Sequence, residues 1–347
     1  MADRSLRILH VTECYSAGTG AVINQMVAGL PEHEHHLLWH ADEDPCSPAD
    51  FRSSHLLPEG TTARIHAVMR AVQRLQPDVV HAHSSWAGIY TRLSRLGVPV
   101  VYQPHCFGFV NPSVPSAQRK AARMVESVLA PRASAIVAVS PHEKRLALGV
   151  VGRSKAHVVM VPNRPSVMAR PPAPSVSVSP VVSMIGRLSP QKDPLFFAEV
   201  ARRVRARRPH VRFQWIGGGT GQSFADALKE VGAQVTGWLD QATMARRLAS
   251  SDLYLHSAAA EGFPISVLDA AASGLPVVVR DIDAFAGLPL TKAIDVSQAA
   301  DHVEQILSVP AARSASLASA AKLLDAMSTG QQADALTELY QHVTRKR

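Results

Sequence analysis

Short apolar runs alternate with amphipathic stretches along the whole chain, and this pattern predicts its architecture. Most of the runs are nearly continuous in apolar residues, as is typical of strands buried on both faces of a parallel sheet. The strand candidates fall at 7–12, 35–40, 78–84, 99–104, 135–139, 158–161, 181–185, 211–216, 234–239, 251–256 and 277–279. Because helical spacing of apolar residues fills most of the segments between them, the pattern predicts an α/β protein with parallel sheets.

A proline-rich segment divides this pattern near its middle. Residues 164–180 contain five prolines and several serines, a composition typical of an extended interdomain linker. A chain of 347 residues is long enough for two domains of ordinary size. We therefore predict two doubly wound α/β domains, at 1–163 and 181–328, followed by a C-terminal helical segment at 329–347.

The segment after the strand candidate at 251–256 places an acidic residue beside the start of a helix. Glu261 and Gly262 lie in a predicted turn, and Pro264 has the backbone angle of a first helical turn. Apolar residues then recur at helical spacing until Gly274, which suits the left-handed residue after a helix. The free N–H groups of a helix N-terminus attract anions. The residues alone leave open whether this carboxylate does more than cap the helix.

A second loop carries cationic residues next to a predicted helix. Gly186, Arg187 and Lys192 lie between the strand candidate at 181–185 and a helix predicted at 194–207. Arginine binds phosphate with a fork of N–H groups, and lysine acts as a point charge. The loop is therefore suited to a diphosphate, although a solvated surface loop explains the same residues equally well.

In the first half, the candidate residues follow strands. A glycine loop with Gly18 and Gly20 precedes a helix predicted at 21–30, but its spacing matches neither a dinucleotide-binding fingerprint nor a P-loop. His83 and His105 end two strands, at the edge where ligands of parallel sheets gather. A histidine in such a position more often only satisfies hydrogen bonds. The segment at 45–58 is rich in turn residues, and we interpret it as a surface connection.

Together these segments resemble the retaining glycosyltransferases of family 4, which have the GT-B fold. The segment that begins at Glu261 is similar to the family signature of two acidic residues, with Asp269 in place of the usual second glutamate. The loop at 186–192 resembles the family's Gly-Arg-x-x-x-x-Lys donor-phosphate motif. The strand ends at 80–83 and 103–105 are similar to the histidine-bearing strands of the family, so the resemblance covers nearly the whole chain.

This resemblance implies an architecture and a set of roles. Two Rossmann-like domains would face each other across a cleft, the first on the acceptor side and the second holding the donor, with helix 329–347 crossing back to the first. His105 and Glu261 would contact the transferred sugar, and Arg187 and Lys192 would bind the diphosphate. The wider set comprises the donor-binding residues Gly18, Gly20, Gly186, Trp238 and Leu239 (for the base), Gly262, Phe263, Pro264, Ile265 and Asp269 (for the ribose), and on the acceptor side His83.

The charge balance favours anionic partners. Lysine and arginine number 36 against 28 acidic residues, giving a formal net charge of +8, which suits phosphorylated small molecules, nucleic acid or an anionic membrane. The arginines at 202–208 lack interleaved aromatic residues, so we expect no nucleic-acid binding. A helix predicted at 117–129 has a basic side that could contact anionic lipid. Its apolar side is interpreted as core, and membrane contact stays open. This apolar side comprises Ala121, Met124, Val125 and Val128.

Metal and disulfide chemistry have little support in the sequence. The histidines at 33–40 have neither a nearby cysteine nor a paired catalytic glutamate, so we expect no metal. Three widely spaced cysteines indicate a reducing cytoplasm. We find neither a signal-peptide pattern nor an apolar run of the roughly 18 residues that span a membrane. We therefore expect a cytoplasmic protein, with peripheral contact at the inner membrane face as an open alternative.

The resemblance implies a metal-independent retaining glycosyltransferase without a cofactor. It would move a sugar from a UDP- or GDP-sugar to a hydroxyl of a saccharide or lipid-linked acceptor, as in bacterial surface polysaccharide, glycolipid or glycoconjugate synthesis. Two alternatives stay open: a catalytically silent GT-B homologue that acts as an assembly partner, and another GT-B enzyme such as a nucleotide-sugar epimerase. The intact pair of Arg187 and Lys192 favours an active enzyme.

Overall fold

A computed structural model describes residues 4–40, 49–173 and 175–345. The chain divides into two compact units, Met1–Arg164 with Ser328–Arg347, and Pro165–Met327. We call them the N-terminal and the C-terminal domain. The C-terminal segment of the chain thus belongs to the N-terminal domain.

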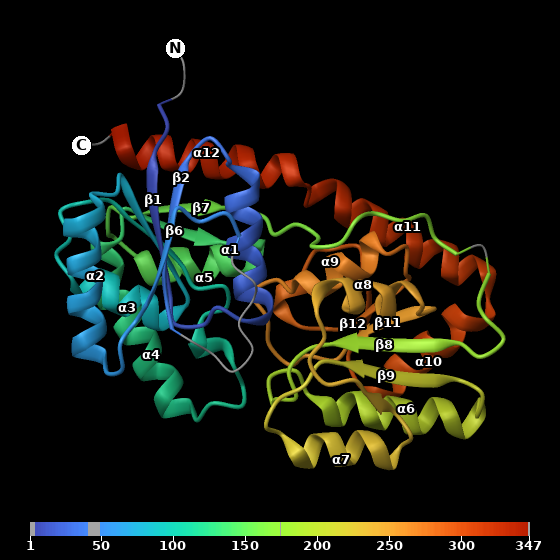
Figure 1. The fold of residues 1–347 in the computed structure, drawn as a ribbon. Coiled ribbons are helices and arrows are strands. Elements are labelled where there is room, and N and C mark those ends of the chain that lie inside the picture. The colour runs from blue at the N-terminus through green and yellow to red at the C-terminus, as the bar shows by residue number, and fades with distance from the viewer. Residues whose placement is uncertain (1–3, 41–48, 174, 346–347) are drawn as a thin grey trace. The chain divides into compact units, whose positions relative to one another are not determined.

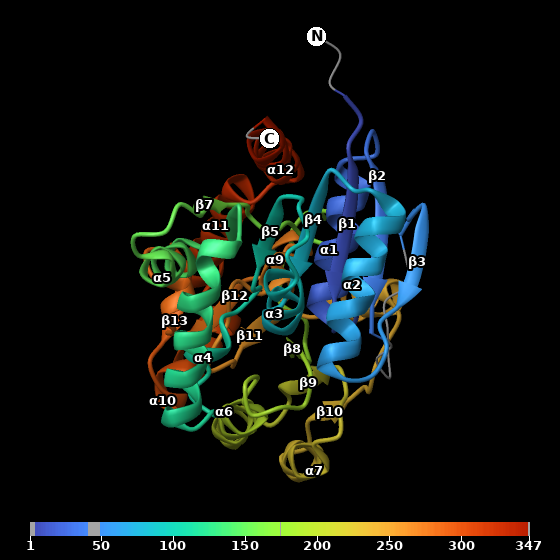
Figure 2. The ribbon, with the colours of Figure 1, turned by 90° about the vertical axis from the view of Figure 1, so that its left-hand side faces the viewer.

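The N-terminal domain is built on a parallel sheet of seven strands in the order β3-β2-β1-β4-β5-β6-β7 (Figures 1 and 2). Its strands are β1 (Arg7–Thr12), β2 (Glu34–Trp39), β3 (Ser53–Leu56), β4 (Val79–His83), β5 (Val100–Gln103), β6 (Ala135–Ala138) and β7 (His157–Met160). The order of strands reverses between β1 and β4, and ligands of open α/β sheets bind at the carboxyl ends of strands at such a switch point.

The two faces of this sheet differ in chemistry, because neighbouring side chains of a strand point to opposite faces. Leu9 of β1 and Val80 of β4 belong to an apolar cluster with residues of α2 and α3. On the opposite face lie His10 and His81, and the His81 ring contacts the Tyr340 hydroxyl of α12. The helices of this domain are α1 (Ala17–Gly29), α2 (Thr61–Leu75), α3 (Ser85–Leu93), α4 (Ser116–Leu129), α5 (Pro141–Val151) and α12 (Thr329–Arg345), with short 3-10 turns η1 (Gly108–Val110) and η2 (Ala130–Arg132).

The C-terminal domain has a parallel sheet of six strands in the order β10-β9-β8-β11-β12-β13. Its elements are β8 (Val181–Ile185), α6 (Pro194–Arg207), β9 (Arg212–Ile216), α7 (Gln222–Glu230), β10 (Gln234–Val235), α8 (Gln241–Ala249), β11 (Leu253–His256), α9 (Ile265–Ala272), β12 (Val277–Arg280), η3 (Asp283–Phe285), β13 (Thr291–Ala293), α10 (Val296–Ser308) and α11 (Pro310–Ala326). Helix α6 packs on α7 and α10, whereas α9 packs on α8 and α11, so helices cover both faces of the sheet (Figure 1). The strand order reverses between β8 and β11.

The expected parallel α/β architecture of both halves is confirmed, and three local expectations are wrong. Gly18 and Gly20 do not form a loop, because α1 begins at Ala17 and both glycines lie in its first turns. The connection at 45–58 contains the edge strand β3, although residues 45–48 lie outside the described residues. Strand β13 contradicts no stated expectation, since no strand was predicted there, and it extends the second sheet beyond β12.

The third wrong expectation concerns α4. Its predicted core side is on the surface, where Met124 is 64% and Val128 62% exposed. The helix instead buries Glu126, whose carboxylate accepts a hydrogen bond from the Tyr102 hydroxyl at 2.7 Å and pairs with the Arg92 guanidinium at 2.9 Å. A buried ion pair therefore attaches α4 to the domain and leaves its apolar stripe free.

Candidate functional site

The strongest candidate site lies at the carboxyl edge of the C-terminal sheet, at the switch point between β8 and β11. The loop after β8 carries Lys192, and the loop after β11 carries Glu261. Lys192 Nζ forms an ion pair with Glu261 Oε1. The Nε2 atom of His256, the last residue of β11, lies 3.3 Å from the same carboxylate oxygen. Three ionisable side chains from two neighbouring strand ends thus meet at one point.

The electrostatics of this cluster keep the carboxylate charged. Burial alone would raise the pKa of Glu261, but the positive charge of Lys192 and the adjacent His256 ring outweigh burial and lower it to about 2. Burial lowers the pKa of His256 even though Glu261 opposes this shift. At neutral pH, Glu261 is therefore an anion that only accepts hydrogen bonds, and His256 is a neutral ring.

Backbone contacts hold the two loops of this cluster together. The Ala259 N–H donates to the Gln191 carbonyl at 2.8 Å, and the Gln191 side-chain amide donates back to the Ala260 carbonyl at 3.0 Å. The Ser257 hydroxyl donates to the Lys192 carbonyl at 2.8 Å. Three reciprocal bonds between loops from different strands fix the position of the Lys192 backbone relative to Glu261.

The glycine-rich segment after β9 packs directly on the loop after β8. Gly217 has a φ of +134°, and a Cβ atom there would lie 2.3 Å from the Gly186 carbonyl oxygen, so a side chain has no room. A Cβ on Gly186 would lie 3.1 Å from the Lys192 side chain. These glycines allow the backbones to approach closely, and Gly186 lies beside the Lys192 side chain.

Two further predicted donor residues have exposed side chains near this loop. Trp238 is 40% exposed, and its ring lies close to the backbone of Gly218. This exposure places Trp238 outside the core, while Leu239 is half-buried beside it. Arg187 is exposed and forms no ion pair with any residue that the structure describes. Both large side chains are available to a ligand.

The start of α9 follows Glu261 directly. Residues Gly262, Phe263, Pro264 and Ile265 are all buried, and α9 begins at Ile265 without a side-chain cap at Pro264. The prediction of a helix start at this point is thus correct to within one residue. Gly274 has the predicted left-handed conformation, with a φ of +73°.

Asp269, the expected ribose ligand, has protein partners in this structure, and its contact with a ribose stays a prediction. It is buried on α9, and both carboxylate oxygens accept hydrogen bonds from Ser166, one from the backbone N–H at 2.5 Å and one from the hydroxyl at 2.8 Å. Burial raises the pKa of Asp269 to about 6. The carboxylate therefore holds the beginning of the linker to the C-terminal domain, because Ser166 reaches both of its oxygens.

In the N-terminal domain, His105 follows β5 and is half-buried, with an unusual φ of +60°. Its Nε2 atom lies 3.1 Å from Nδ1 of His83. The expectation that His83 lines an acceptor surface is wrong, since this side chain is fully buried and both ring nitrogens have partners. The His83 ring lies next to the His105 ring and stacks with it.

Sequence reasoning missed His256 and Glu13. Both lie where His83 and His105 led us to look, at or just after the carboxyl end of a strand at a switch point. The Glu13 carboxylate accepts hydrogen bonds from the Ser84 hydroxyl and from the Ala87 N–H at 3.0 Å, which caps the start of α3. Burial raises its pKa. The position of Glu13 between β1 and β4 makes it a candidate for the acceptor side.

A metal site was considered from the sequence only at the histidines 33–40, whereas the structure gathers a different group of rings. The rings that gather are those of His10, His81 and His83, whose nitrogen atoms lie within 4.8 Å of one another and are fully buried. Each of the two nitrogens on His10 and on His83 contacts another imidazole at 3.0 or 3.1 Å. As the structure describes it, this group is a hydrogen-bonded assembly, and no metal is needed to account for its contacts.

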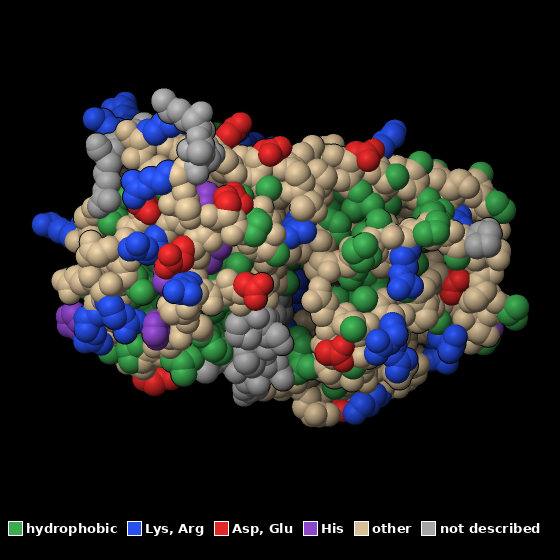
Figure 3. All heavy atoms as spheres, turned by 45° about the horizontal axis from the view of Figure 1, so that its top comes forward, with side chains coloured by type: hydrophobic (Ala, Val, Ile, Leu, Met, Phe, Trp, Pro, Cys, Tyr) green, Lys and Arg blue, Asp and Glu red, His purple; other side chains and the backbone are tan. Residues whose placement is uncertain are grey.

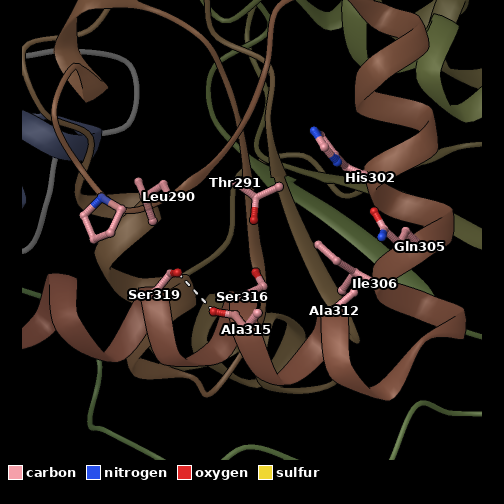
Figure 4. A pocket seen from close by; sticks show the side chains of 10 residues that line it. Leu290, Thr291, His302, Gln305, Ile306, Ala312, Ala315, Ser316 and Ser319 are labelled. Carbon is pink, nitrogen blue, oxygen red and sulfur yellow. Dashed lines mark hydrogen bonds between the residues drawn. The ribbon is translucent and has the colours of Figure 1, made fainter.

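Concave and charged surfaces elsewhere contain none of the predicted site residues. A hollow of about 270 Å³ lies between β13, α10 and α11, and His302, Gln305 and Ser319 are among the residues that line it (Figure 4).

On the face drawn in Figure 3, Lys and Arg side chains are scattered over both domains rather than gathered in a stripe. Among 202–208, Arg207 pairs with Asp301 and Glu304. Within the described residues, we find no helix long and apolar enough to cross a bilayer.

Known proteins match both halves of the chain. A family model for a glycosyl transferase 4-like domain matches residues 17–164, and one for glycosyl transferases group 1 matches residues 179–324. The UDP-Gal:alpha-D-GlcNAc-diphosphoundecaprenol alpha-1,3-galactosyltransferase of Escherichia coli is 26% identical over 247 residues, which are 62% of this chain and 61% of that protein. The D-inositol 3-phosphate glycosyltransferase of Kineococcus radiotolerans is 27% identical over 336 residues, covering 83% of this chain and 76% of that protein.

Solved structures agree with the fold. Sucrose-phosphate synthase from Thermosynechococcus elongatus superposes with a TM-score of 0.82 at 15% identity, over 98% of this chain and 100% of that one. Anabaena HepE, solved in complex with UDP, gives a TM-score of 0.75 at 15% identity, over 97% and 100%. The fold class predicted from the sequence, with two Rossmann-like domains of the GT-B type, is confirmed. With its two matched domains and this fold, the chain belongs to the GT-B glycosyltransferases.

Proposed function

We propose that this protein transfers a sugar from a UDP-sugar to a hydroxyl of a lipid-linked saccharide, with retention of the anomeric configuration and without a metal ion. The observation that carries the proposal is the cluster of Lys192, Glu261 and His256 at the switch point of the C-terminal sheet. It brings a fixed cation and a fixed anion to the sheet edge where nucleotides bind in this kind of fold. The UDP donor is supported by the printed name of the E. coli relative and by the UDP complex of HepE.

The reaction requires that negative charge on the departing diphosphate be stabilised. Lys192 and the exposed Arg187 are the cations of the loop after β8, and the uncapped N-terminus of α9 adds a positive dipole. In metal-dependent enzymes this neutralisation is one task of the ion. We infer that these three groups perform it here.

The ionised Glu261 accepts hydrogen bonds from sugar hydroxyls and favours the positive charge that develops on the sugar carbon. The family resemblance assigns a contact with the transferred sugar to His105 as well. The bond from the sugar carbon to the diphosphate breaks, a bond to the acceptor oxygen forms on the same face, and the acceptor proton passes to the departing phosphate. This route needs no covalent nucleophile from the protein.

A lipid-linked acceptor is supported by two observations of different kinds. The E. coli relative is named for an undecaprenol-linked acceptor. In this chain, α4 exposes Met124, Val125 and Val128 on the same helix as the basic Lys120 and Arg123. An exposed apolar stripe flanked by cations suits peripheral contact with an anionic membrane, which is where such an acceptor resides.

Thermal unfolding with UDP, GDP, ADP, CDP and TDP tests the donor site. A ligand at 100 times its dissociation constant stabilises the native state by about 2.7 kcal/mol. We expect UDP to raise the melting temperature of the wild type and of Lys229→Ala, an exposed lysine of the same domain, but not that of Lys192→Ala. If no nucleotide shifts any of these proteins, the silent assembly partner becomes the better interpretation.

A further inference from the structure

Four imidazole rings form a continuous hydrogen-bonded chain through the N-terminal domain. His35 Nε2 lies 2.9 Å from the Leu30 carbonyl oxygen, and His35 Nδ1 lies 3.0 Å from His10 Nε2. His10 Nδ1 lies 3.0 Å from His83 Nε2, and His83 Nδ1 lies 3.1 Å from His105 Nε2. Neighbouring rings in the chain have centroids 5.3 Å apart. The imidazole chain crosses from β2 through β1 and β4 to His105, the second residue after β5.

The Leu30 carbonyl fixes the direction of every bond in this chain. A carbonyl oxygen only accepts, so His35 carries its hydrogen on Nε2 and its bare Nδ1 accepts from His10. A neutral imidazole has one N–H and one acceptor nitrogen. The same step therefore repeats at each ring: His10 accepts from His83, and His83 accepts from the Nε2–H of His105.

The four rings of the imidazole chain are neutral, since each has one N–H and one bare nitrogen. Burial lowers the pKa of His10, His35, His83 and His105 from the ordinary value. A proton added to His10, His35 or His83 would place an N–H opposite the N–H of the next ring. Hydrogen-bond direction and burial thus both disfavour the charged form of these three rings, whereas burial alone disfavours it for His105.

The chain ends with a bare Nδ1 on His105, at the carboxyl edge of the sheet. The Gln103 side-chain nitrogen lies 3.5 Å from this atom, which is the outer limit of a hydrogen bond. The left-handed backbone of His105 is uncommon for a residue other than glycine, and such conformations gather at functional sites. A closer donor is therefore well placed to engage the Nδ1 lone pair.

We propose that His10, His35 and His83 are positioning residues, which hold His105 in the tautomer whose Nδ1 accepts a hydrogen bond from a hydroxyl of the donor sugar. The proposal rests on the proposed function for the identity of the ligand. His105 then takes part as a neutral hydrogen-bond acceptor. The buried Leu30 carbonyl, at the other end of the four rings, determines which of its nitrogens is bare. The recognised group is a hydroxyl that donates its hydrogen, in a sugar attached to UDP.

A divalent cation is the competing occupant of these imidazoles. His10, His81 and His83 are close enough together to bind one, and His81 Nε2 is buried without a hydrogen-bond partner. A metal would have to take a nitrogen from both His10 and His83, which would cut the chain at its centre. The two arrangements therefore exclude each other, and experiment can separate them.

Nuclear magnetic resonance of protein labelled with ¹⁵N-histidine reads the tautomers directly, because protonated and bare ring nitrogens have different shifts. We expect one tautomer for His105, protonated at Nε2, in the wild type. In His35→Phe the anchor at Leu30 is lost, and we expect a mixture of tautomers at His105. The matched control is His81→Phe, which removes a buried ring of the same sheet face outside the chain and leaves the His105 spectrum unchanged.

A ligand series then tests the consequence for recognition. The probes are UDP-glucose, UDP-galactose and UDP-N-acetylglucosamine, followed by deoxyfluoro analogues of the tightest binder, since fluorine accepts but cannot donate. One fluorine position should weaken binding to the wild type and to His81→Phe about tenfold, roughly the worth of one hydrogen bond. The same substitution should matter less than threefold in His35→Phe, whereas UDP itself binds both variants as it binds the wild type.

Several outcomes would overturn the proposal. They are a mixed tautomer of His105 in the wild type, an unchanged one in His35→Phe, or a tautomer shift of the same size in His81→Phe. Stoichiometric binding of Zn²⁺ or Co²⁺ that is lost in His81→Phe would replace the chain with a metal site. If the tautomers are as expected but no UDP-sugar binds, the proposed function fails and the recognition of a sugar fails with it, while the tautomer chain stands.

Discussion

Lys192 and Glu261, which are 69 positions apart in the sequence, form an ion pair at the carboxyl edge of the C-terminal sheet. The family resemblance assigns Lys192 to the diphosphate and Glu261 to the sugar, yet the structure makes them partners of each other. The pair is largely withdrawn from water, with side-chain exposures of 19% and 9%. It therefore has a structural role that is separable from any role in binding.

The first prediction concerns the energetic coupling of this pair. Lys192→Met leaves the Glu261 carboxylate buried beside a neutral side chain, and we expect a loss of about 3 kcal/mol in the free energy of unfolding. Adding Glu261→Gln removes the unpaired charge, so the double variant should lose about 1–3 kcal/mol less than the sum of the single losses. Urea denaturation of all four proteins measures the cycle. Additive losses would show that the two side chains do not support each other.

The second prediction concerns pH and Asp269. Its pKa is about 6 in the folded protein, above the value of about 3.9 in an unfolded chain. The folded state thus binds the proton more tightly, and the stability of the wild type falls as pH rises from about 4 to about 6. The total is on the order of 3 kcal/mol. Asp269→Asn, which cannot ionise, should lack this fall.

The comparison is the unfolding free energy of the wild type minus that of Asp269→Asn, measured at pH 4, 5, 6 and 7. Asp240 provides a control of opposite sign, since hydrogen bonds from Thr243 lower its pKa. The wild type minus Asp240→Asn should fall only as pH drops below about 4, so it stays nearly flat where the Asp269 difference changes. A difference for Asp269 that also rises with pH would mean that the Ser166 donors outweigh burial.

The regular elements of the C-terminal domain could be predicted closely because local signals agree with burial there. The bounds of β8 and α6 are those expected from the sequence, and α8 likewise begins directly after an aspartate. Asp193 and Asp240 cap the two helices by accepting hydrogen bonds from the backbone N–H groups of Phe196 and Thr243. A strong cap before an apolar periodic stretch leaves little freedom in where a helix begins.

Other features could not be predicted because their partners come from distant parts of the chain. The stripe of Met124 and Val128 has the periodicity of a core face, but Glu126 determines how α4 is oriented through its buried contacts with Arg92 and Tyr102. The spacing of Asp269 from Glu261 identifies the motif and says nothing of Ser166. The imidazole chain likewise depends on which strands are neighbours in the sheet, and sequence periodicity does not contain that information.

A third prediction concerns Trp238 as a platform for the base. The ring is exposed beside the glycine-rich segment after β9, and stacking of a base on an aromatic ring contributes about 1–3 kcal/mol. We expect Trp238→Ala to weaken UDP binding about tenfold or more, measured by calorimetry, and Trp238→Phe to retain most of the affinity. Trp86→Ala is the control, since Trp86 is an exposed tryptophan of the N-terminal domain. Equal UDP affinity in Trp238→Ala and the wild type would place the base elsewhere.

The last prediction tests the surface of α4. A double substitution of Met124→Glu and Val128→Glu puts two charges on residues that are already exposed, so we expect folding to be unaffected. If the stripe contacts a membrane, the wild type sediments with vesicles that contain phosphatidylglycerol and less with pure phosphatidylcholine, because Lys120 and Arg123 add electrostatic attraction. The double variant should remain in the supernatant with both.

Leu195→Glu is the matched control, because Leu195 is an exposed apolar residue on α6 of the other domain, 52% accessible to solvent. It should sediment with anionic vesicles as the wild type does. Salt separates the two contributions: the electrostatic part is screened over about 8–10 Å near physiological ionic strength, whereas burial of Met124 and Val128 in the bilayer interface is not weakened by salt. Binding that vanishes in salt and is unchanged in the double variant would assign the contact to scattered surface charge instead of α4.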